Sequence, residues 1–327
     1  MYALAPPLAA KSKLHGRHFL AVSDVAPAEL ASLLRLAAFL RSRPLAEHAS
    51  LLRGRTVALL FEKPSLRTRV SFEVATNHLG GETLFAQGAE FMVGSRETPE
   101  DAARVLSRYV DAIVVRTHAH EPLERFAASA SVPVVNGLSA AAHPCQALAD
   151  VLTLQEKFGE IAGLRVAYLG DGRNNVAASL GEAVVMLGGT IHFGAPPTHR
   201  PSEAYLAHLA RLGRESGGKA RAFSNPVRAV RGVDAIYTDV WTSMGEERYR
   251  EQNDALLRPY AVSAELFSYA APHAIFMHCL PAHRGEEVED AVIDASNSAV
   301  FDQAENRMHA QKALLAALLT DCRGLPL

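Results

Sequence analysis

Short apolar segments alternate with helical patterns along most of this chain, and that alternation constrains the fold more than any other feature of the sequence. Strands that alternate with helices form parallel sheets covered by helices. The sequence therefore predicts an α/β fold with parallel sheets. The predicted strands are Thr56–Phe61, Thr83–Phe85, Ala112–Val115, Val132–Val135, Arg165–Leu169, Thr190–Phe193, Ala220–Phe223, Ala235–Thr238 and Ala274–Met277.

The length predicts two domains, because 327 residues exceed what one hydrophobic core usually organises. A helical pattern over Pro144–Phe158, followed by Gly159, is the predicted joint. We expect one domain over residues 1–150 and a second over residues 151–327. Residues 303–319 are apolar around much of a helical circumference, so we expect this C-terminal helix to return to the first domain. Residues 213–219, which contain Gly217-Gly218, are predicted to be a surface loop.

Composition and charge argue against several classes of partner. The net charge is -2 and no basic run contains interleaved aromatic residues, so neither a nucleic acid nor an anionic membrane is expected as partner. No apolar stretch approaches the ~20 residues that span a bilayer, and residues 1–10 lack the positive start of a signal peptide. Three cysteines form no disulfide framework. We therefore expect a reducing, cytoplasmic location.

The segment after the first strand predicts an anion site. Ser65-Leu66-Arg67-Thr68-Arg69 opens a helical pattern that ends at Gly80-Gly81. The first turn of a helix offers unpaired N–H groups and the positive end of the helix dipole. Hydroxyl and guanidinium groups added to that turn favour a small, strongly anionic group such as phosphate. Arg116 ends another strand, where it is either a second cation for the same anion or an ordinary surface arginine.

His143-Pro144-Cys145-Gln146 precedes the helical pattern of the predicted joint. Pro144 suits the first position of a helix. His143 can then donate a hydrogen bond to a carbonyl oxygen that gains negative charge, or it can simply cap the helix. Zinc binding by His143 and Cys145 is the weaker interpretation, since no second pair with metal-ligand spacing occurs elsewhere. We therefore expect no metal site.

Residues 165–175 look at first like a dinucleotide-binding fingerprint, but they fail on two details. Asn175 occupies the position of the third glycine, and the next strand ends in Gly194 with no acidic residue for a ribose. A nicotinamide cofactor is therefore not expected. Asn175 is better interpreted as a polar contact for the carboxylate or amino group of a substrate.

Polar residues follow two further strands. Asp239 precedes Ser243-Met244-Gly245, so a carboxylate can hold an ammonium group while Ser243 and nearby backbone bind a second polar end. Cys279 follows the last strand within His278-Cys279-Leu280-Pro281, where it is either a nucleophile or a small polar group lining a pocket. We favour the lining role. Taken alone, Arg307 would be read as a solvated side chain.

Four of these segments together resemble the aspartate/ornithine carbamoyltransferase family, from Arg17 to the C-terminal helix. They are S-x-R-T-R at residues 65–69, H-P-x-Q at 143–146, D-x-x-x-S-M-G at 239–245 and H-C-L-P at 278–281. The first two resemble the family's shared carbamoyl phosphate signature, and the last two resemble its ornithine branch. The resemblance implies transfer of a carbamoyl group from carbamoyl phosphate to the δ-amine of L-ornithine, giving L-citrulline and phosphate in arginine metabolism. It also implies a homotrimer and no cofactor.

The resemblance also assigns site residues, position by position. It implies that carbamoyl phosphate is bound by Ser65, Leu66, Arg67, Thr68, Arg116, His143, Pro144, Cys145, Gln146, Cys279, Leu280 and Arg307. It implies that ornithine is bound by Asn175, Asp239, Ser243 and Met244. The catalytic set that it implies is Arg67, Arg116, His143, Asp239 and Cys279.

Two departures from the family pattern and three rival interpretations accompany this assignment. Leu66 stands where threonine is common, and Met92 stands where the family pattern leads us to expect a glutamine that reaches a neighbouring subunit's site.

The rival interpretations of function are transfer to another amine such as putrescine or an N-acylated ornithine, a binding or regulatory subunit, and a dehydrogenase. The sequence fixes neither the anabolic or catabolic direction, nor assembly beyond a trimer, nor allosteric control, nor a role for residues 1–13.

Overall fold

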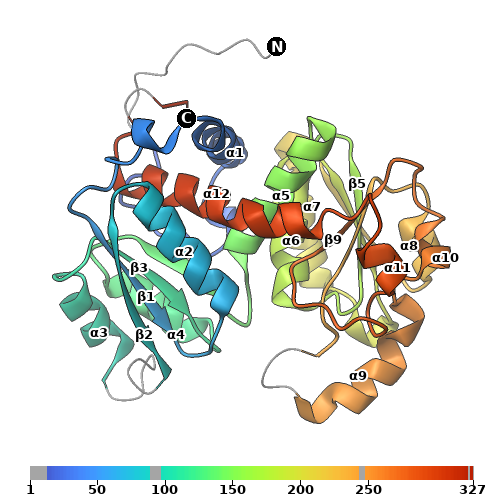
Figure 1. The fold of residues 1–327 in the computed structure, drawn as a ribbon. Helices are drawn as coiled ribbons and strands as arrows, with labels where there is room; N and C mark the ends of the chain where they lie inside the picture. Colours follow the sequence, from blue (N-terminus) through green and yellow to red (C-terminus); the bar gives the residue numbers. More distant parts are fainter. Residues whose placement is uncertain (1–12, 89–96, 243–246, 323–324, 327) are drawn as a thin grey trace. The chain divides into compact units, whose positions relative to one another are not determined.

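The computed structural model describes residues 13–88, 97–242, 247–322 and 325–326, and the chain forms two compact units (Figure 1). Unit 1 comprises Met1–Leu152 with Asn306–Leu327, and unit 2 comprises Thr153–Glu305. The boundary falls inside two helices, α5 (Pro144–Phe158) and α12 (Val300–Leu319). The predicted fold class is confirmed, since each unit contains a parallel sheet flanked by helices. The predicted domain limits at residues 150 and 151 stay a prediction.

Unit 1 contains a four-stranded parallel sheet in the order β2-β1-β3-β4. Its strands are β1 (Thr56–Phe61), β2 (Glu82–Gln87), β3 (Ala112–Arg116) and β4 (Val134–Leu138). The complete α-helices among its described residues are α1 (Pro27–Ser42), α2 (Leu66–His78), α3 (Pro99–Leu106) and α4 (Glu121–Ser129). Strand β1 is buried on both faces, as its uninterrupted apolar sequence predicts.

Unit 2 contains a five-stranded parallel sheet in the order β7-β6-β5-β8-β9. Its strands are β5 (Arg165–Leu169), β6 (Thr190–Gly194), β7 (Lys219–Phe223), β8 (Ala235–Thr238) and β9 (Ile275–His278). Its complete helices are α6 (Asn175–Met186), α7 (Glu203–Ser216), α8 (Pro226–Val230), α9 (Arg250–Leu257), α10 (Ala264–Phe267) and α11 (Asp290–Ile293).

The order of the strands places a topological switch point in each sheet. In unit 1 the chain leaves β1 for β2 on one side and returns to β3 on the other. In unit 2 the same reversal separates β5 from β8. Ligands of open parallel sheets bind beyond the carboxyl ends of the strands at such a point. We therefore expect ligand-binding residues directly after β1, β3, β5 and β8.

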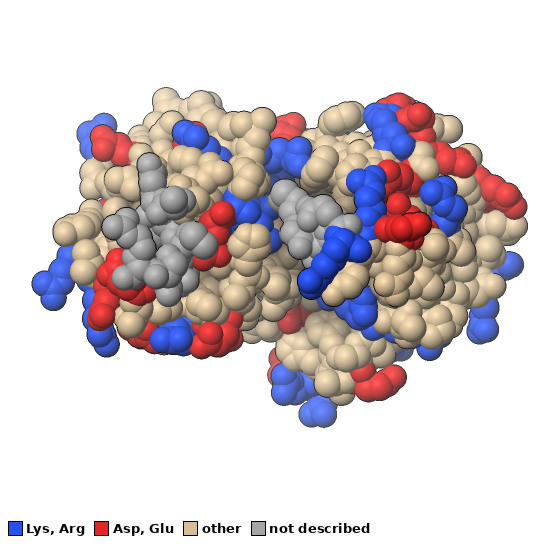
Figure 2. All heavy atoms as spheres, turned by 90° about the horizontal axis from the view of Figure 1, so that it is seen from below, with Lys and Arg blue, Asp and Glu red and all other residues tan. Residues whose placement is uncertain are grey.

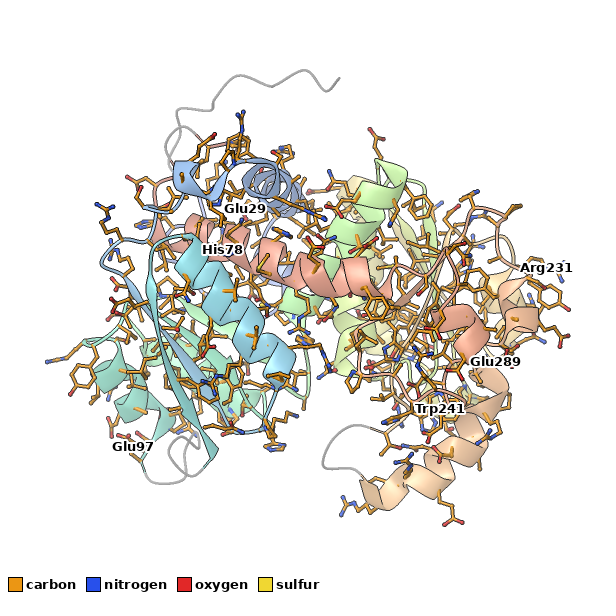
Figure 3. All side chains as sticks on the ribbon, in the orientation of Figure 1. Glu29, His78, Glu97, Arg231, Trp241 and Glu289 are labelled. Atoms are coloured by element: carbon orange, nitrogen blue, oxygen red, sulfur yellow. The ribbon has the colours of Figure 1, made fainter. Side chains whose placement is uncertain are left out.

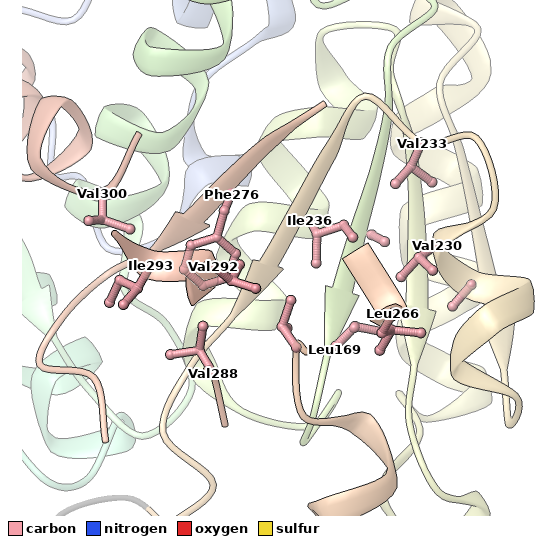
Figure 4. Packing of buried hydrophobic residues seen from close by; sticks show 13 residues of the cluster. Leu169, Val230, Val233, Ile236, Leu266, Phe276, Val288, Val292, Ile293 and Val300 are labelled. Atoms are coloured by element: carbon pink, nitrogen blue, oxygen red, sulfur yellow. The ribbon is translucent and has the colours of Figure 1, made fainter. Parts of the chain in front are cut away.

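The cores consist of alternate strand residues that pack against helices. In unit 2 a cluster of thirteen buried residues includes Ile236, Phe276, Val292 and Val300 (Figure 4). In unit 1 a comparable cluster joins Leu60 and other strand residues to α3 and α4.

The surface seen in Figure 2 carries Lys and Arg interspersed with Asp and Glu, which agrees with a net charge of only -2. None of the described helices is long and apolar enough to cross a membrane.

Several predicted boundaries were wrong, and those of β2, β3, β6, β7 and β9 differ by one or two residues at one or both ends. Strand β4 begins at Val134 rather than Val132, because Pro133 has no N–H to donate to a sheet. Helix α12 begins three residues earlier than predicted, at Val300. Most of the predicted loop over residues 213–219 is helical, because α7 continues to Ser216. Only a tight turn at Gly217-Gly218 separates α7 from β7, and Gly217 takes a φ of 79° there.

Candidate active site

The N-terminus of α2 in unit 1 carries the first predicted motif. Ser65 is the N-cap of the helix, and its Oγ accepts a hydrogen bond from the Thr68 backbone N–H at 3.4 Å. The same hydroxyl donates to Thr68 Oγ1 at 3.0 Å. These two contacts fix the first turn of α2 at the carboxyl end of β1. The turn presents the N–H groups and positive dipole that an anion requires.

The two arginines of this motif lie in different environments. Arg69 donates to Glu73 Oε1 at 2.9 Å, and its guanidinium lies 3.9 Å from the centroid of the Phe85 ring. Arg67 is exposed, and its side chain makes no ion pair or hydrogen bond to the described residues. Leu66 is 77% exposed, so its side chain takes no part in the core. Arg67 is therefore the arginine of this pair that is available to a ligand.

Arg116 is the last residue of β3 and is buried. It is directly opposite Phe61, the last residue of β1, so both strands end at the same level. The register between β3 and β4 shifts at this point, where Val115 pairs with Asn136 and Arg116 with Leu138. Such an irregularity redirects a strand end. The structure thus places Arg116 at the switch point of the unit 1 sheet, next to the segment that leads into α2.

His143 precedes α5, whose first residue is Pro144 as predicted. The His143 carbonyl accepts hydrogen bonds from the N–H groups of Gln146 and Ala147, so the residue also caps the helix. Burial lowers the pKa of the His143 imidazole well below its ordinary value, and the positive charges of Arg307, Arg116 and Lys63 lower it further. A neutral imidazole among cations can donate a hydrogen bond without carrying a charge of its own.

Arg307 on α12 is a buried side chain rather than the solvated one that the local sequence suggested. Its Nη2 donates to Thr68 Oγ1 at 2.7 Å, and its Nη1 donates to Gln146 Oε1 at 2.8 Å. Gln146 Nε2 in turn donates to Asp150 Oδ1 at 2.8 Å. Arg307 therefore connects the first turn of α2 to the first turn of α5, all within unit 1.

Cys145 is buried beside this network, and its Sγ donates to the Asn136 carbonyl at 3.5 Å. Burial raises the pKa of the Cys145 thiol to about 12. The thiolate is the form that binds metals and acts as a nucleophile. This thiol is therefore suited to packing rather than to zinc binding or nucleophilic attack.

Unit 2 carries the second group of predicted residues. Asp239 follows β8, and its Oδ1 accepts hydrogen bonds from Cys279 Sγ at 3.0 Å and from its neighbour Val240 N–H at 2.8 Å. Asn174 Nδ2 donates to Asp239 Oδ2 at 3.1 Å. The carboxylate is thus held by donors from the ends of three strands, β5, β8 and β9, at the switch point of the unit 2 sheet.

Asn174, beside the predicted Asn175, is a further residue of this group that the sequence patterns did not indicate. Asn174 caps α6, with its Oδ1 accepting the Ala177 N–H at 2.8 Å, so one amide both starts the helix and orients Asp239. Asn175 is the first residue of α6 and is half-buried. An N-cap preference for asparagine is the signal that could have identified Asn174.

Tyr168 on β5 was also missed. It is buried and stacks on Tyr237 with ring centroids 5.8 Å apart. Burial raises the pKa of its phenol well above the ordinary value, and the Asp239 carboxylate adds to that effect. The phenol therefore stays protonated beside Asp239.

Leu280, which follows Cys279, has an unusual backbone conformation. Its φ is 55°, and its N–H donates a hydrogen bond to His278 Nδ1 at 2.8 Å. A leucine in the left-handed region is held there by its surroundings. Trp241, which follows Asp239 by two residues, is buried (Figure 3). Ser243, Met244 and Met92 lie outside the described residues.

Comparison with known proteins identifies the family to which this arrangement belongs. A model described as the carbamoyl-P binding domain of aspartate/ornithine carbamoyltransferase matches residues 17–156. A second, described as the Asp/Orn binding domain of the same enzymes, matches residues 162–318. The chain belongs to the aspartate/ornithine carbamoyltransferase family. The family resemblance read from the four motifs is therefore confirmed.

Individual relatives cover almost the whole chain. An ornithine carbamoyltransferase from Pyrococcus abyssi is 49% identical over 307 residues, which are 94% of this chain and 96% of that protein. A protein named ornithine carbamoyltransferase, anabolic, from Pyrococcus furiosus is 48% identical over 94% of this chain and 97% of its own. A solved structure of ornithine carbamoyltransferase from Pyrococcus furiosus matches with a TM-score of 0.90 and 48% identity, over 94% of this chain and 98% of its own.

We predict that His143 remains neutral well below pH 6.5. A free imidazole would be about nine-tenths protonated at pH 5.5, whereas the depressed pKa of His143 keeps the folded chain from taking up that proton. The folded state then binds fewer protons than the unfolded state, so the stability that His143 contributes above pH ~6.5 is lost as the pH falls. NMR spectra of the labelled imidazole between pH 8 and 5.5 measure this directly, and a protonation midpoint at or above ~6.5 would contradict it.

Proposed function

We propose that this protein is an ornithine carbamoyltransferase. It transfers the carbamoyl group of carbamoyl phosphate to the δ-amine of L-ornithine and releases L-citrulline and phosphate. The observation that carries the proposal is the exposed Arg67 on the capped first turn of α2, together with buried Arg116 at the end of β3, the strand beside β1. Relatives 49% and 48% identical over 94% of the chain, which are named ornithine carbamoyltransferases, support the same reaction.

The phosphate end of carbamoyl phosphate suits the α2 turn. Thr68 and the backbone N–H groups of the turn supply donors, Ser65 fixes the turn by donating to Thr68 Oγ1, and Arg67 and Arg116 supply charge. Phosphate is the leaving group, so its negative charge grows as the bond to the carbamoyl carbon breaks. Fixed cations and helix N–H groups stabilise that developing charge without reorganising.

The carbamoyl end suits the start of α5. A neutral His143 donates a hydrogen bond to the carbamoyl oxygen, which becomes negative as the amine attacks. Gln146 and Arg307 hold the first turn of α5 in place through their mutual hydrogen bond. Pro144 and Cys145 shape the same turn, and Leu66 contributes through its backbone alone because its side chain is exposed.

The amine end suits Asp239 in unit 2. The δ-ammonium of ornithine, with an ordinary pKa near ~10.4, must lose a proton before its nitrogen can attack. Asp239 and the Cys279 thiol, joined by their 3.0 Å hydrogen bond, orient the amine, and the carboxylate favours the departure of its proton. Asn175, Ser243 and Met244 are assigned to the α-amino acid end of ornithine, while Leu280 stays assigned to carbamoyl phosphate, as the resemblance implies.

We also infer that copies of this chain assemble through α2 and β2, in keeping with the homotrimer that the resemblance implies. Leu66 and Val70 on α2 are 77% and 45% exposed, and Leu84 on the edge strand β2 is 50% exposed. Apolar side chains grouped on neighbouring elements favour a protein interface.

The biosynthetic direction of the reaction is proposed from the relative named anabolic. The cytoplasmic location stays a prediction.

Product analysis with a panel of amines tests the proposed function. Carbamoyl phosphate is offered with ornithine, putrescine, N-acetylornithine and aspartate in parallel, and each carbamoylated product is quantified. We expect citrulline from ornithine and no comparable product from the other three. Preferential transfer to another amine would retain the phosphate site and refute the assigned acceptor. Absence of transfer to all four would refute the enzymatic assignment.

Arg67→Ala is expected to lower turnover by at least ~100-fold, because it removes a cation from the developing phosphate charge. Arg69→Ala is the matched control, since it removes an arginine two positions away that is already bound to Glu73 and Phe85. We expect a much smaller effect from the control. Steady-state kinetics of both variants decide the matter, and equal losses would show that Arg67 has no special role.

A further inference from the structure

A tight turn in unit 2 brings three metal-ligating residues together just after the H-C-L-P motif. The Glu286 N–H donates to the His283 carbonyl at 3.0 Å, which closes a four-residue turn over residues 283–286. Gly285, the third residue, has a φ of 80°, as a type II turn requires. Because the turn folds the chain back on itself, His283 lies beside Glu286 and Glu287 rather than pointing away from them.

The ligand atoms of these residues are spaced as a bound cation would space them. His283 Nδ1 is 3.5 Å from Glu286 Oε2 and 3.9 Å from Glu287 Oε2, and the ligand atoms of the three residues lie within 4.8 Å of one another. Two metal bonds of ~2.0–2.2 Å that meet at a tetrahedral angle separate their ligand atoms by about 3.3–3.6 Å. The His283–Glu286 separation already falls in that range and the His283–Glu287 separation exceeds it by about 0.3 Å, while the two carboxylates would have to approach each other by at most about 1.2 Å.

Glu287 supplies an independent reason to expect a cation. Its side chain is 0% exposed, and Oε2 has no hydrogen-bond partner among the described residues. The other oxygen, Oε1, accepts the His283 backbone N–H at 2.5 Å and faces His278 Nε2 at 3.3 Å. A buried carboxylate oxygen is costly to leave without a donor or a cation. Glu287 Oε2, the oxygen without a hydrogen-bond partner among the described residues, is the one that faces His283 Nδ1.

We propose that His283, Glu286 and Glu287 bind a divalent transition-metal ion of the Zn²⁺ class. One imidazole nitrogen and two carboxylate oxygens suit Zn²⁺ and its neighbours better than Mg²⁺ or Ca²⁺, which prefer oxygen ligands alone. The His283 and Glu286 side chains are 43% and 30% exposed, so the ion enters from solvent and a water molecule completes its coordination. This site does not depend on the proposed reaction.

Arg250 on α9 affects the affinity of the site for the metal but leaves one oxygen of Glu286 available as a ligand. Its Nη2 donates to Glu286 Oε1 at 2.5 Å, which leaves Oε2 directed at His283. The guanidinium orients the carboxylate as partners of metal ligands do, but its positive charge also opposes a nearby cation. Replacing Arg250 by methionine is therefore expected to change the affinity for the metal while leaving all three ligands in place.

The site shares Glu287 with the motif residue His278. The Leu280 N–H donates to His278 Nδ1, so Nε2 carries the ring proton and donates to Glu287 Oε1. His278 itself is buried and ends β9, one residue before Cys279. A cation on Glu287 would thus lie one hydrogen bond away from the strand end that carries the Cys279 thiol.

Metal titration of the chelator-treated full chain tests the proposal. Zn²⁺ binding is measured by equilibrium dialysis with metal analysis, and Co²⁺ is followed by its visible absorption. We expect one ion per chain and an affinity at least ~10-fold weaker in His283→Ala. Glu286→Gln is expected to weaken binding in the same direction. Both side chains are partly exposed, so both variants should fold, and thermal unfolding without metal verifies that they do.

Two controls separate this site from other ligands in the chain. Asp239, His278 and Cys279 form a second cluster of metal-ligating residues, so Cys279→Ser tests whether the ion binds there instead. A Cys279 ligand would also give Co²⁺ an intense thiolate charge-transfer band. His15→Ala removes an exposed imidazole elsewhere in the chain. Unchanged affinity in both controls supports the proposal. Loss of binding in Cys279→Ser, or wild-type affinity in folded His283→Ala, would overturn it.

Discussion

The candidate phosphate site depends on one buried guanidinium. Arg307 donates to Thr68 on α2 and to Gln146 on α5, so a single side chain on α12 fixes the first turns of two other helices. Burying a cation is costly unless hydrogen bonds replace its water, and each hydrogen bond to a charged group contributes roughly 1.5–3 kcal/mol. The same positive charge acts on His143, whose pKa it helps to lower. Position and protonation state in this part of the molecule therefore have a common origin.

The parallel sheets explain why residues far apart in sequence meet within each unit. Every strand in a unit 1 or unit 2 sheet runs the same way, so all loops that follow strands collect at one edge. Arg116 ends β3 level with the end of β1, and Asp239 follows β8 beside β5 and β9. The switch points supply the space in which those side chains collect. The order of the strands, and not any local motif, therefore brings these residues together within each unit.

Much of this was predictable from sequence, because the signals were local. Apolar runs located the strands, and Pro144 marked the start of α5 at the residue where the helix begins. The misses came from long-range contacts. Nothing near Arg307 in sequence indicates Thr68 or Gln146, which lie 239 and 161 residues away. The role of Asn174 was not predicted, because its hydrogen bond to Asp239 crosses 65 residues. The cluster at residues 283–287, on which the metal proposal rests, was not indicated by the sequence because its carboxylates look like an ordinary charged turn.

The central claim is that the capped turn of α2 and Arg116 bind the phosphate of carbamoyl phosphate. The most direct measurement is a crystal structure of the protein with a stable analogue in which a methylene group replaces the bridging oxygen. We predict phosphonate oxygens within hydrogen-bond distance of the Arg67 and Arg116 guanidiniums and of the backbone N–H groups that follow Ser65, with the amide oxygen directed at His143. An analogue bound elsewhere, or bound in this site with its amide end at the α2 turn, would contradict the account.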